Sequence, residues 1–530
     1  MIKAILIDKL DNVAMVTKQA EVGDEILVTE TGQVLKAIET IKEGHKVALS
    51  RLEEGEFAIK YGIPIGRMTS AIDVGGWISV HNLEDITAEL CGERCQDFRD
   101  GVSTVKTFPP QETVTRMIKA FPRKDGTFGI RNYIMVISTS PETNAVAEAI
   151  SDKTGCSWLV CNRTRLENGV ISKYTRDTMM WTGRNPNLYA VLVLGYDNDT
   201  SESRGIYNFI AEIDKPVQYL SLTGIDEAAA ISEGSAIIAG YQKDASELKR
   251  ELVSMEGFGL AVHCSGSDWT TSINGNSAVG LAADRIVEHG GKVYMTEWME
   301  WSGSQHLMAE KCVTRELGLE LLDFLDSVRE VVLEETGLPV EHMNPAPVNK
   351  EQGLTTLAEK SIGTIKKVGH TPIQGLLNHA EQPTGKGVWL PKHDSVWPPT
   401  TASYASLCGA HMSILNTGVG FLYFELPHLL CIRTTGNPAT FAKEELRLDF
   451  NAGMAFEKPL SEVGDMLFDY FIRVAEGDED PQTEINKDRA FNMYYYNERE
   501  FGPDAPREKM LPAGVINYHE TRKQYTDRVK

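Results

Sequence analysis

The chain has 530 residues, of which 42% are hydrophobic and 24% charged, and a formal net charge of −22 at pH 7. That length predicts about three or four folding units of ordinary globular composition. The negative charge argues against a nucleic-acid partner, because phosphate contacts need a basic surface, and the lack of an apolar run near ~18–20 residues argues against a membrane partner.

Residues 1–90 are predicted to form a small β-rich domain. Short alternating runs such as KAILI and DEILV are separated by turns that contain glycine or aspartate, which is typical of strands. Early charges and the lack of a small-residue cleavage site predict no signal peptide. Eight cysteines without framework spacing indicate a reducing compartment, so we expect a cytoplasmic protein. Residues 91–117 are polar, include Pro109-Pro110 and are predicted to be a linker.

From residue 118 the pattern changes to α/β. Apolar runs such as LYAVLVLGYD and GLAVHCSG alternate with helical ones such as SAVGLAADRIVEHG. Continuous apolar strands interleaved with helices indicate parallel sheets covered by helices. We expect a first α/β domain over 118–335 and a second over 336–530 that ends in a charged, aromatic tail. The predicted fold class is therefore α/β, with a small β-rich domain before a large multi-layer α/β region.

The first candidate side chains lie near the start of the chain. The β-rich domain carries two histidines and two lysines in short motifs, namely His45, Lys46, Lys60 and His81. They could face a shared cleft, although a lone histidine is more often structural. Further along, Arg131-Asn132 precedes an apolar strand, where the arginine fork could clamp a carboxylate bidentately. The alternative is that Arg131 pairs with Asp125 to close a turn.

Two polar segments follow strands of the α/β region. Residues 264–268, CSGSD, come directly after the strand-like LAVH, and such turns are where α/β sheets place ligands. Asp268 could bind a metal or a substrate hydroxyl, or it could cap a helix. After the next strand, Glu297 and Glu300 share a face if helical, and His306 follows. This spacing allows a divalent metal site, although glutamates at helix starts are common without metals.

Residues 344–369, NPAPVNKEQGLTTLAEKSIGTIKKVG, concentrate amides and cations among glycines and threonines. Backbone N–H groups and fixed cations in such loops suit the binding of an anion or a carboxylate. The alternative is a helix start with a solvated basic face, because charge runs usually face water. Asn349, Lys350 and Lys360 are the candidate ligands here.

Many of these strings resemble the signatures of the altronate/galactarate dehydratase family, and the likeness extends along most of the chain. Residues 344–369 are similar to NPSPGN–GGLTT–EKSLG, and residues 264–280 to CGGSDxxSGxxANPAVG. GHKVAL, KYG, IG and HNL in the first 90 residues resemble the SAF module that opens these dehydratases, a β-clip-like domain. Five other strings match. DGTFGIRNY resembles DGRxGxRNY, TEWMEWSGSQH resembles SETxExxGAEH, and NTGVG resembles TTGRG. IRTTGNP and LDFNAG resemble KxATN and DxNAG.

The resemblance implies a sugar-acid hydro-lyase whose front module is a lid or arm that delivers a histidine to the active site. The catalytic candidates are then His45, Lys46, His81 and Arg131. The expected substrate contacts are Asn276, Asn349, Lys350, Lys360, Thr417, Arg433, Asn437 and Asp449. Each of the C-terminal residues in this set could equally lie in a surface turn. The expected metal ligands are Asp268, Glu297, Glu300 and His306, holding Fe²⁺, Mn²⁺ or Mg²⁺.

The expected reaction is dehydration of an aldonate or aldarate, such as altronate or galactarate, to a 2-keto-3-deoxy acid. The proton α to the carboxylate is very weakly acidic, so a cation must stabilise the enediolate-like intermediate. A base takes that proton while an acid helps the β-hydroxyl to leave. We assign the carboxylate clamp to Lys350, Lys360 and Arg433, acid/base chemistry to His45 or His81, and we expect a homodimer.

The chain departs from the family pattern at several positions. Glu142, the segment 162–166 and Tyr196-Asp197 stand where the family has cysteine-containing strings, Val419 replaces an arginine, and Ser79 replaces a second histidine. Thiolates favour iron, clusters or zinc, so their joint loss indicates that one thiolate-bound metal is gone, with Glu142 and Asp197 able to hold a hard cation instead. The alternatives are an enzyme with a changed metal site, a degenerate paralogue that binds a sugar acid without turnover, or an anion-binding regulatory subunit.

Overall fold

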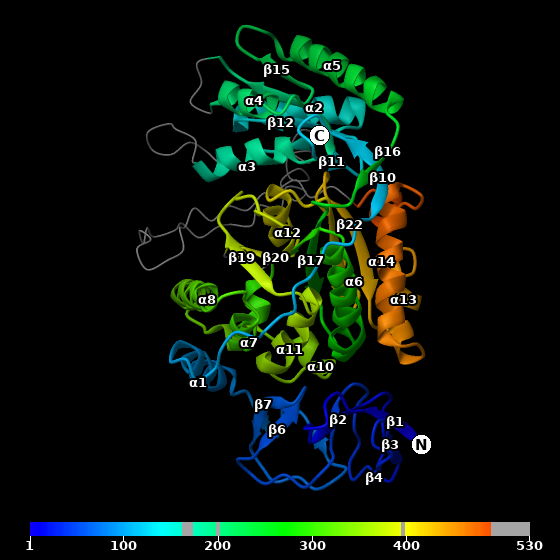
Figure 1. The fold of residues 1–530 in the computed structure, drawn as a ribbon. Coiled ribbons are helices and arrows are strands. Elements are labelled where there is room, and N and C mark those ends of the chain that lie inside the picture. Colours follow the sequence, from blue (N-terminus) through cyan, green and yellow to red (C-terminus); the bar gives the residue numbers. More distant parts are fainter. Residues whose placement is uncertain (162–172, 198–201, 394–397, 424, 489–530) are drawn as a thin grey trace, which may run out of the picture.

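The computed structural model describes residues 1–161, 173–197, 202–393, 398–423 and 425–488. Three bodies follow one another along the long axis of the molecule (Figure 1). The N-terminal domain (residues 1–86) lies at one end, the C-terminal domain (residues 255–488) in the middle, and the second domain (residues 117–254) at the other end. Among the helices that the structure describes, none combines the length and the apolarity needed to cross a membrane.

The N-terminal domain consists of two small sheets, ordered β4-β3-β1-β2-β5-β8 and β6-β7-β9. Its strands are β1 (Ile2–Ile5), β2 (Val13–Val16), β3 (Glu25–Val28), β4 (Val34–Lys36), β5 (Lys46–Ala48), β6 (Phe57–Lys60), β7 (Ile63–Met68), β8 (Trp77–Ile78) and β9 (Leu83–Glu84). In β3, Ile26 and Val28 are fully buried whereas Glu25 is exposed, as expected for a sheet with one face on a core. The predicted β-rich start of the chain is confirmed.

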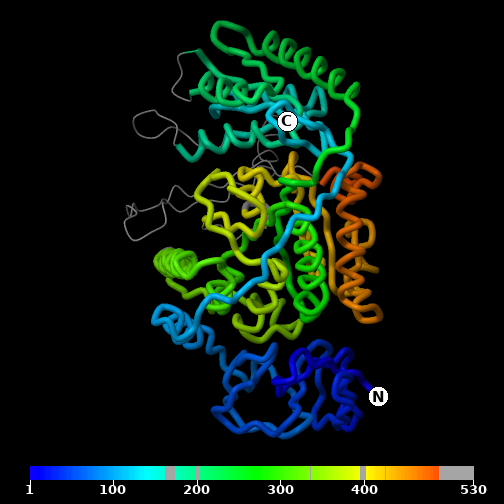
Figure 2. Tube along the Cα trace, in the orientation of Figure 1, coloured from blue at the N-terminus to red at the C-terminus, as the bar shows by residue number. Residues whose placement is uncertain are grey.

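The segment predicted to be a linker, 91–117, is partly helical. Helix α1 (Thr87–Arg99) buries Cys91, Cys95 and Phe98 at spacings of three to four residues, a periodicity that the polar residues between them obscure. Residues 100–116 contain no helix or strand and run along the C-terminal domain to the second domain (Figure 2). The N–H of Lys106 donates to the carbonyl of Glu310 at 2.7 Å, so this connection is bonded to the surface that it crosses.

The second domain combines an antiparallel ribbon with a four-stranded parallel sheet. The ribbon holds β10 (Met117–Pro122), β11 (Phe128–Gly129) and β16 (Glu251–Ser254), and the sheet, ordered β13-β12-β14-β15, holds β12 (Tyr133–Ser138), β13 (Ser157–Leu159), β14 (Leu188–Gly195) and β15 (Val217–Ser221). Helices α2 (Asn144–Thr154) and α5 (Glu227–Glu247) cover one face, and α3 (Lys173–Arg184) and α4 (Ser203–Ala211) cover the other. Because both faces are covered, β14 is apolar along almost its whole length.

The C-terminal domain is built on one seven-stranded parallel sheet, ordered β19-β20-β18-β17-β21-β22-β23. The strands are β17 (Gly259–Ser265), β18 (Lys292–Met295), β19 (Ile373–Leu377), β20 (Gly387–Pro391), β21 (Met412–Thr417), β22 (Leu430–Thr435) and β23 (Phe450–Asn451). The helices are α6 (Asn276–Glu288), α7 (Gln305–Glu310), α8 (Arg315–Thr336), α9 (Val340–Met343), α10 (Pro347–Glu351), α11 (Leu357–Thr364), α12 (Pro398–Leu407), α13 (Pro438–Lys443), α14 (Leu460–Glu476) and α15 (Gln482–Ile485). Helices α6 and α14 pack together on one side of this sheet.

The expected division at residues 335/336 does not separate two sheets. Strands β17 and β18, which precede it, pair with β21 and β20, which follow it. Parallel strands are joined by long crossover connections, so two paired strands can be far apart in the sequence. Periodicity alone could not reveal this pairing. The α/β class itself is confirmed.

Candidate active site

The candidate residues gather where the parallel sheet of the C-terminal domain ends. Strands β17, β18, β21 and β22 run in the same direction, so their carboxyl ends share one edge, which is where α/β proteins place ligands. This edge faces the N-terminal domain: Trp269, just after β17, lies so close to Gly44 that a Cβ on this glycine would come within 2.1 Å of its ring. The junction therefore joins the front module to the sheet, as the sequence predicted.

Two buried lysines hold that junction. The ammonium of Lys46 donates to the carbonyl of Gly353 at 2.9 Å, to Thr355 Oγ1 at 2.7 Å and to Glu359 Oε2 at 2.9 Å. Lys60 donates to Glu359 Oε1 at 2.7 Å. An ammonium has three donors, so Lys46 has none left for a substrate, and its geometry indicates domain docking where we predicted catalysis. Burial raises the pKa of Glu359, but the two ammonium groups outweigh it and bring the pKa to about 2.

His45 is the nearest candidate for acid/base chemistry. Its Nε2 lies 3.1 Å from the carbonyl oxygen of Glu351, and because a carbonyl only accepts, this nitrogen carries the proton. Nδ1 keeps its lone pair and has no hydrogen-bond partner among the described residues. Burial lowers the pKa of His45 to about 4, so the ring is neutral near pH 7. His81 is exposed, and the ring of Trp77 contacts both histidines, at 5.4 Å from His45 and 5.7 Å from His81 between ring centroids.

Helix α10 carries the predicted Asn349 and Lys350 to the same junction. Asn349 Nδ2 donates to the carbonyl of Ser267 at 2.7 Å, and its Oδ1 accepts from the N–H of Ala346 at 3.0 Å, so this amide fastens α10 to the turn after β17. Lys350 is partly exposed. In the described part of the chain, its ammonium makes no hydrogen bond or ion pair, which leaves this cation available to an anionic ligand.

Asp268 closes the turn that follows β17. Its Oδ1 accepts from the backbone and hydroxyl of both Thr270 and Thr271 at 2.7–2.9 Å. Its Oδ2 accepts from Asn437 Nδ2 at 2.8 Å, while Asn437 Oδ1 caps α13. Both carboxylate oxygens accept hydrogen bonds from the protein, and the residue is fully buried. These contacts match the helix-capping role that the sequence offered as the alternative to metal binding.

The two predicted glutamate ligands each face a lysine. Glu297 Oε1 accepts from the N–H of Cys264 at 2.7 Å, and Oε2 pairs with Lys367. Glu300 pairs with Lys360 at 2.9 Å. Burial raises the pKa of Glu297, and the Lys367 ammonium partly offsets this. Sequence reasoning did not single out Lys367, because the Lys366-Lys367 doublet gives no signal as to which lysine is buried.

The predicted metal ligands Asp268, Glu297, Glu300 and His306 do not converge. In the part of the chain that the structure describes, no three of them place ligand atoms within 4.8 Å of one another. His306 lies in α7, which packs on α1, and burial lowers its pKa to about 4. These four residues do not fit a divalent cation, and no chemical step is assigned to one there.

The remaining predicted substrate ligands mostly bind protein atoms. Asn276 Nδ2 donates to the carbonyl of Gly363 at 3.0 Å, and Thr417 Oγ1 accepts from the N–H of Gly420 at 3.1 Å. Arg433 is fully buried and pairs with Asp488 at 2.6 Å. Asp449 Oδ2 accepts from the Arg433 N–H at 2.6 Å, and burial raises the pKa of Asp449 to about 6.

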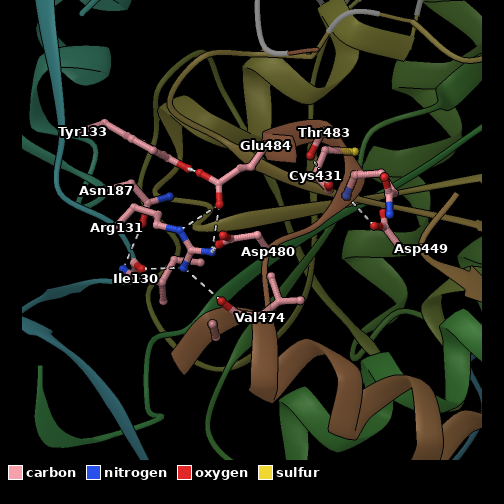
Figure 3. Close-up of polar contacts among 12 residues, drawn as sticks. Ile130, Arg131, Tyr133, Asn187, Cys431, Asp449, Val474, Asp480, Thr483 and Glu484 are labelled. Carbon is pink, nitrogen blue, oxygen red and sulfur yellow. Dashed lines mark hydrogen bonds and ion pairs between the residues drawn. The ribbon is translucent and has the colours of Figure 1, made fainter. Parts of the chain in front are cut away.

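Arg131 lies at the other junction, where the second domain meets α14 and α15 (Figure 3). Its Nε and Nη2 donate to Glu484 Oε2 at 3.0 and 2.9 Å, and Nη1 donates to the carbonyl of Val474 at 2.9 Å. The N-terminal domain, with His45, is at the opposite end of the molecule (Figure 1). Arg131 does clamp a carboxylate, but the carboxylate belongs to the protein, so its position does not fit the predicted catalytic role.

The positions where family cysteines are replaced lie in the second domain. Asp197 accepts from Arg204 at 2.6 Å and from Ser221 at 2.9 Å, so protein donors use the carboxylate that we considered for a hard cation. Residues 162–166, the second such position, lie outside the described residues.

Comparisons with known proteins agree with these motifs. Three family models match in succession: the altronate/galactarate dehydratase SAF domain at residues 2–86, the D-galactarate dehydratase/altronate hydrolase second domain at 120–246, and the D-galactarate/altronate dehydratase C-terminal domain at 255–498. Altronate dehydratases from Bacillus subtilis and Escherichia coli are each 26% identical to the chain, covering 89% of it and 95% of the relative. The (2R)-sulfolactate sulfo-lyase subunit beta of Chromohalobacter salexigens is 29% identical over 68% of the chain and 93% of the relative.

Proposed function

Because the chain belongs to the altronate/galactarate dehydratase family, we propose that it is a carbon–oxygen lyase that removes water from a sugar acid. The observation that links this chemistry to residues is the domain junction. There the neutral His45 contacts the carbonyl of Glu351, the residue that follows Lys350 in the chain, and its Nδ1 has no hydrogen-bond partner among the described residues.

The finer chemistry that we propose is an elimination. Nδ1 of His45 takes the proton α to the substrate carboxylate, and the Lys350 ammonium opposes the negative charge that develops there. The β-hydroxyl leaves with a proton as water, for which the exposed His81 is the candidate acid. The enol product then tautomerises to a 2-keto-3-deoxy acid. Lys46 and Lys60 support this step by holding the N-terminal domain in place.

A sugar-acid-binding protein without turnover is the second candidate. The observation that favours it is the pairing of Glu297 and Glu300 with Lys367 and Lys360, which occupies the carboxylates that we predicted for a catalytic metal.

A substrate screen separates the candidates. The purified chain is incubated with altronate, galactarate and (2R)-sulfolactate, with and without Fe²⁺, Mn²⁺ and Mg²⁺, while 2-oxo acid, sulfite and the melting temperature are measured. We expect 2-oxo acid from at least one of the two sugar acids, and a higher KM in Lys350→Met but not in the exposed control Lys249→Met. Stabilisation without product supports the binding protein, sulfite release supports a sulfo-lyase, and no response to any acid contradicts all three.

We also propose a cytoplasmic homodimer. All eight cysteines are buried, and the structure records no disulfide among its described residues, which suits a reducing compartment. Size-exclusion chromatography with light scattering measures the mass of the assembly, and a mass of one chain would contradict the dimer.

A further inference from the structure

A second cluster of side chains that could bind a metal lies in the seven-stranded sheet of the C-terminal domain, on the face opposite to that of Cys264. His263 directly precedes Cys264 in β17, so the two side chains point to opposite faces. Beside His263 lie Cys431, in the nearby strand β22, and Glu425, in the loop before that strand. One ring nitrogen, one carboxylate oxygen and the sulfur are all within 4.8 Å of one another, and each residue is at most 2% exposed.

Several polar atoms of this cluster have no hydrogen-bond partner among the described residues, whereas Cys431 Sγ donates to the carbonyl of Ile432 at 3.6 Å. Neither ring nitrogen of His263 has a hydrogen-bond partner among the described residues, and the same holds for Glu425 Oε1. Arg433 Nε forms an ion pair with that oxygen at 3.8 Å, a separation that is too long for a hydrogen bond. A buried polar atom without a partner destabilises the folded protein, so native proteins rarely leave several together.

The chemistry of the three groups indicates what would satisfy them. Imidazole nitrogen, carboxylate oxygen and cysteine sulfur can each give an electron pair to one cation. Imidazole and thiolate favour late first-row metals, whereas Mg²⁺ and Ca²⁺ prefer oxygen alone. Ligand distances of ~2.0–2.3 Å place tetrahedral donors about 3.5 Å apart. The donor atoms lie within 4.8 Å of one another, so no pair needs to approach by more than about 1.3 Å.

We propose that His263, Glu425 and Cys431 bind a divalent late first-row metal, Zn²⁺ or Fe²⁺. Three protein ligands leave a further coordination position for water or another group. This site shares no residue with the four ligands predicted from the sequence. It also does not depend on the proposed dehydration, because it rests on the donor set and the unpaired atoms alone.

Metal content tests the proposal directly. The untagged, full-length protein is equilibrated with Zn²⁺ or Fe²⁺, dialysed, and analysed by mass spectrometry of the metals. We expect about one equivalent in the wild type and less than a tenth of that in Glu425→Gln and Cys431→Ser. The matched control is Cys408→Ser, which alters another fully buried thiol outside the cluster and should keep the metal.

Two spectroscopic measurements separate the loss of a metal ligand from poor folding of a variant. Co²⁺ bound through a thiolate gives a charge-transfer absorption, which we expect in the wild type and in Cys408→Ser but not in Cys431→Ser. Circular dichroism establishes that each variant is folded before its metal is counted. A wild type that stays metal-free with all three cations, or folded ligand variants that keep a full equivalent, would overturn the site.

Discussion

At the scale of single residues, burial separates the lysines of this protein into two kinds. Lys46, Lys60 and Lys367 are at most 1% exposed and pair with buried glutamates, whereas Lys350 is partly exposed and unpaired among the described residues. A charge that is desolvated and fully bonded stabilises the fold but cannot also bind a ligand. Only the second kind is available to a substrate carboxylate.

Replacing His45 tests the proposed base. We expect His45→Asn to lower kcat by about 10²–10⁴-fold, because the proton acceptor is lost, while the melting temperature changes little. In the wild type, kcat/KM should fall as the pH drops through about 4, since protonation of Nδ1 removes the base. His370→Asn, at an exposed histidine, is the matched control. Unchanged kcat in folded His45→Asn would contradict the assignment.

Replacing Glu359 tests the junction clamp. Glu359→Gln leaves two buried lysines without their counter-ion, so we expect the free energy of unfolding to fall by about 3–5 kcal/mol. Urea titration measures this free energy, with the fluorescence of Trp77 in the N-terminal domain as the signal. Glu53→Gln, which breaks an exposed pair with Arg51, should have little effect because surface pairs are screened. Equal effects of the two substitutions would contradict the clamp.

The pH dependence of the same clamp has a definite sign. The folded-state pKa of Glu359 is about 2 and its ordinary value is 4.5, so its contribution is fully present above about pH 4.5 and is lost as the pH falls through about 2. We expect the difference in melting temperature between wild type and Glu359→Gln to shrink between pH 5 and 2.5. A constant difference over that range would argue against an ionised Glu359.

At the scale of elements, the turn between α10 and α11 positions the junction. Gly353 has φ +91°, and a Cβ there would meet the carbonyl oxygen of Gly44 at 2.2 Å. Gly353→Ala should therefore push the loop that carries His45 away from α10. Gly257→Ala introduces similar backbone strain, at φ +82°, with no atom within 4 Å of the new methyl, so it serves as the control.

We expect Gly353→Ala to destabilise the protein by about 1–3 kcal/mol more than Gly257→Ala does, which is the usual cost of overpacking. Turnover should fall in Gly353→Ala alone, because His45 is displaced. Thermal unfolding and steady-state kinetics measure the two effects. Identical behaviour of the two variants would show that close approach at Gly353 is not required.

At the scale of the whole molecule, Arg131 connects the second domain to the C-terminal domain through Glu484 and Val474 (Figure 3). We expect Arg131→Met to lower the free energy of unfolding by about 2 kcal/mol, the scale of hydrogen bonds to charged groups. Hydrogen exchange at α15 should speed up while kcat/KM is retained. Arg204→Met, at an exposed pair in the same domain, is the control. A loss of kcat/KM without faster hydrogen exchange would contradict this structural role and support the catalytic role that the sequence predicted for Arg131.

Local periodicity and short strings of characteristic spacing were sufficient to predict the α/β class, the β-rich start and the family, because these features do not depend on contacts between distant segments. The contact between His45 and Glu351, by contrast, joins two residues that are 306 positions apart in the sequence. The single sheet across residue 335 and the role of α1 depended on pairing between distant segments. Which charges are available to a ligand depends on the folded arrangement. Lys46 and Lys350 look alike in sequence, and they differ in the partners that the fold places around each ammonium.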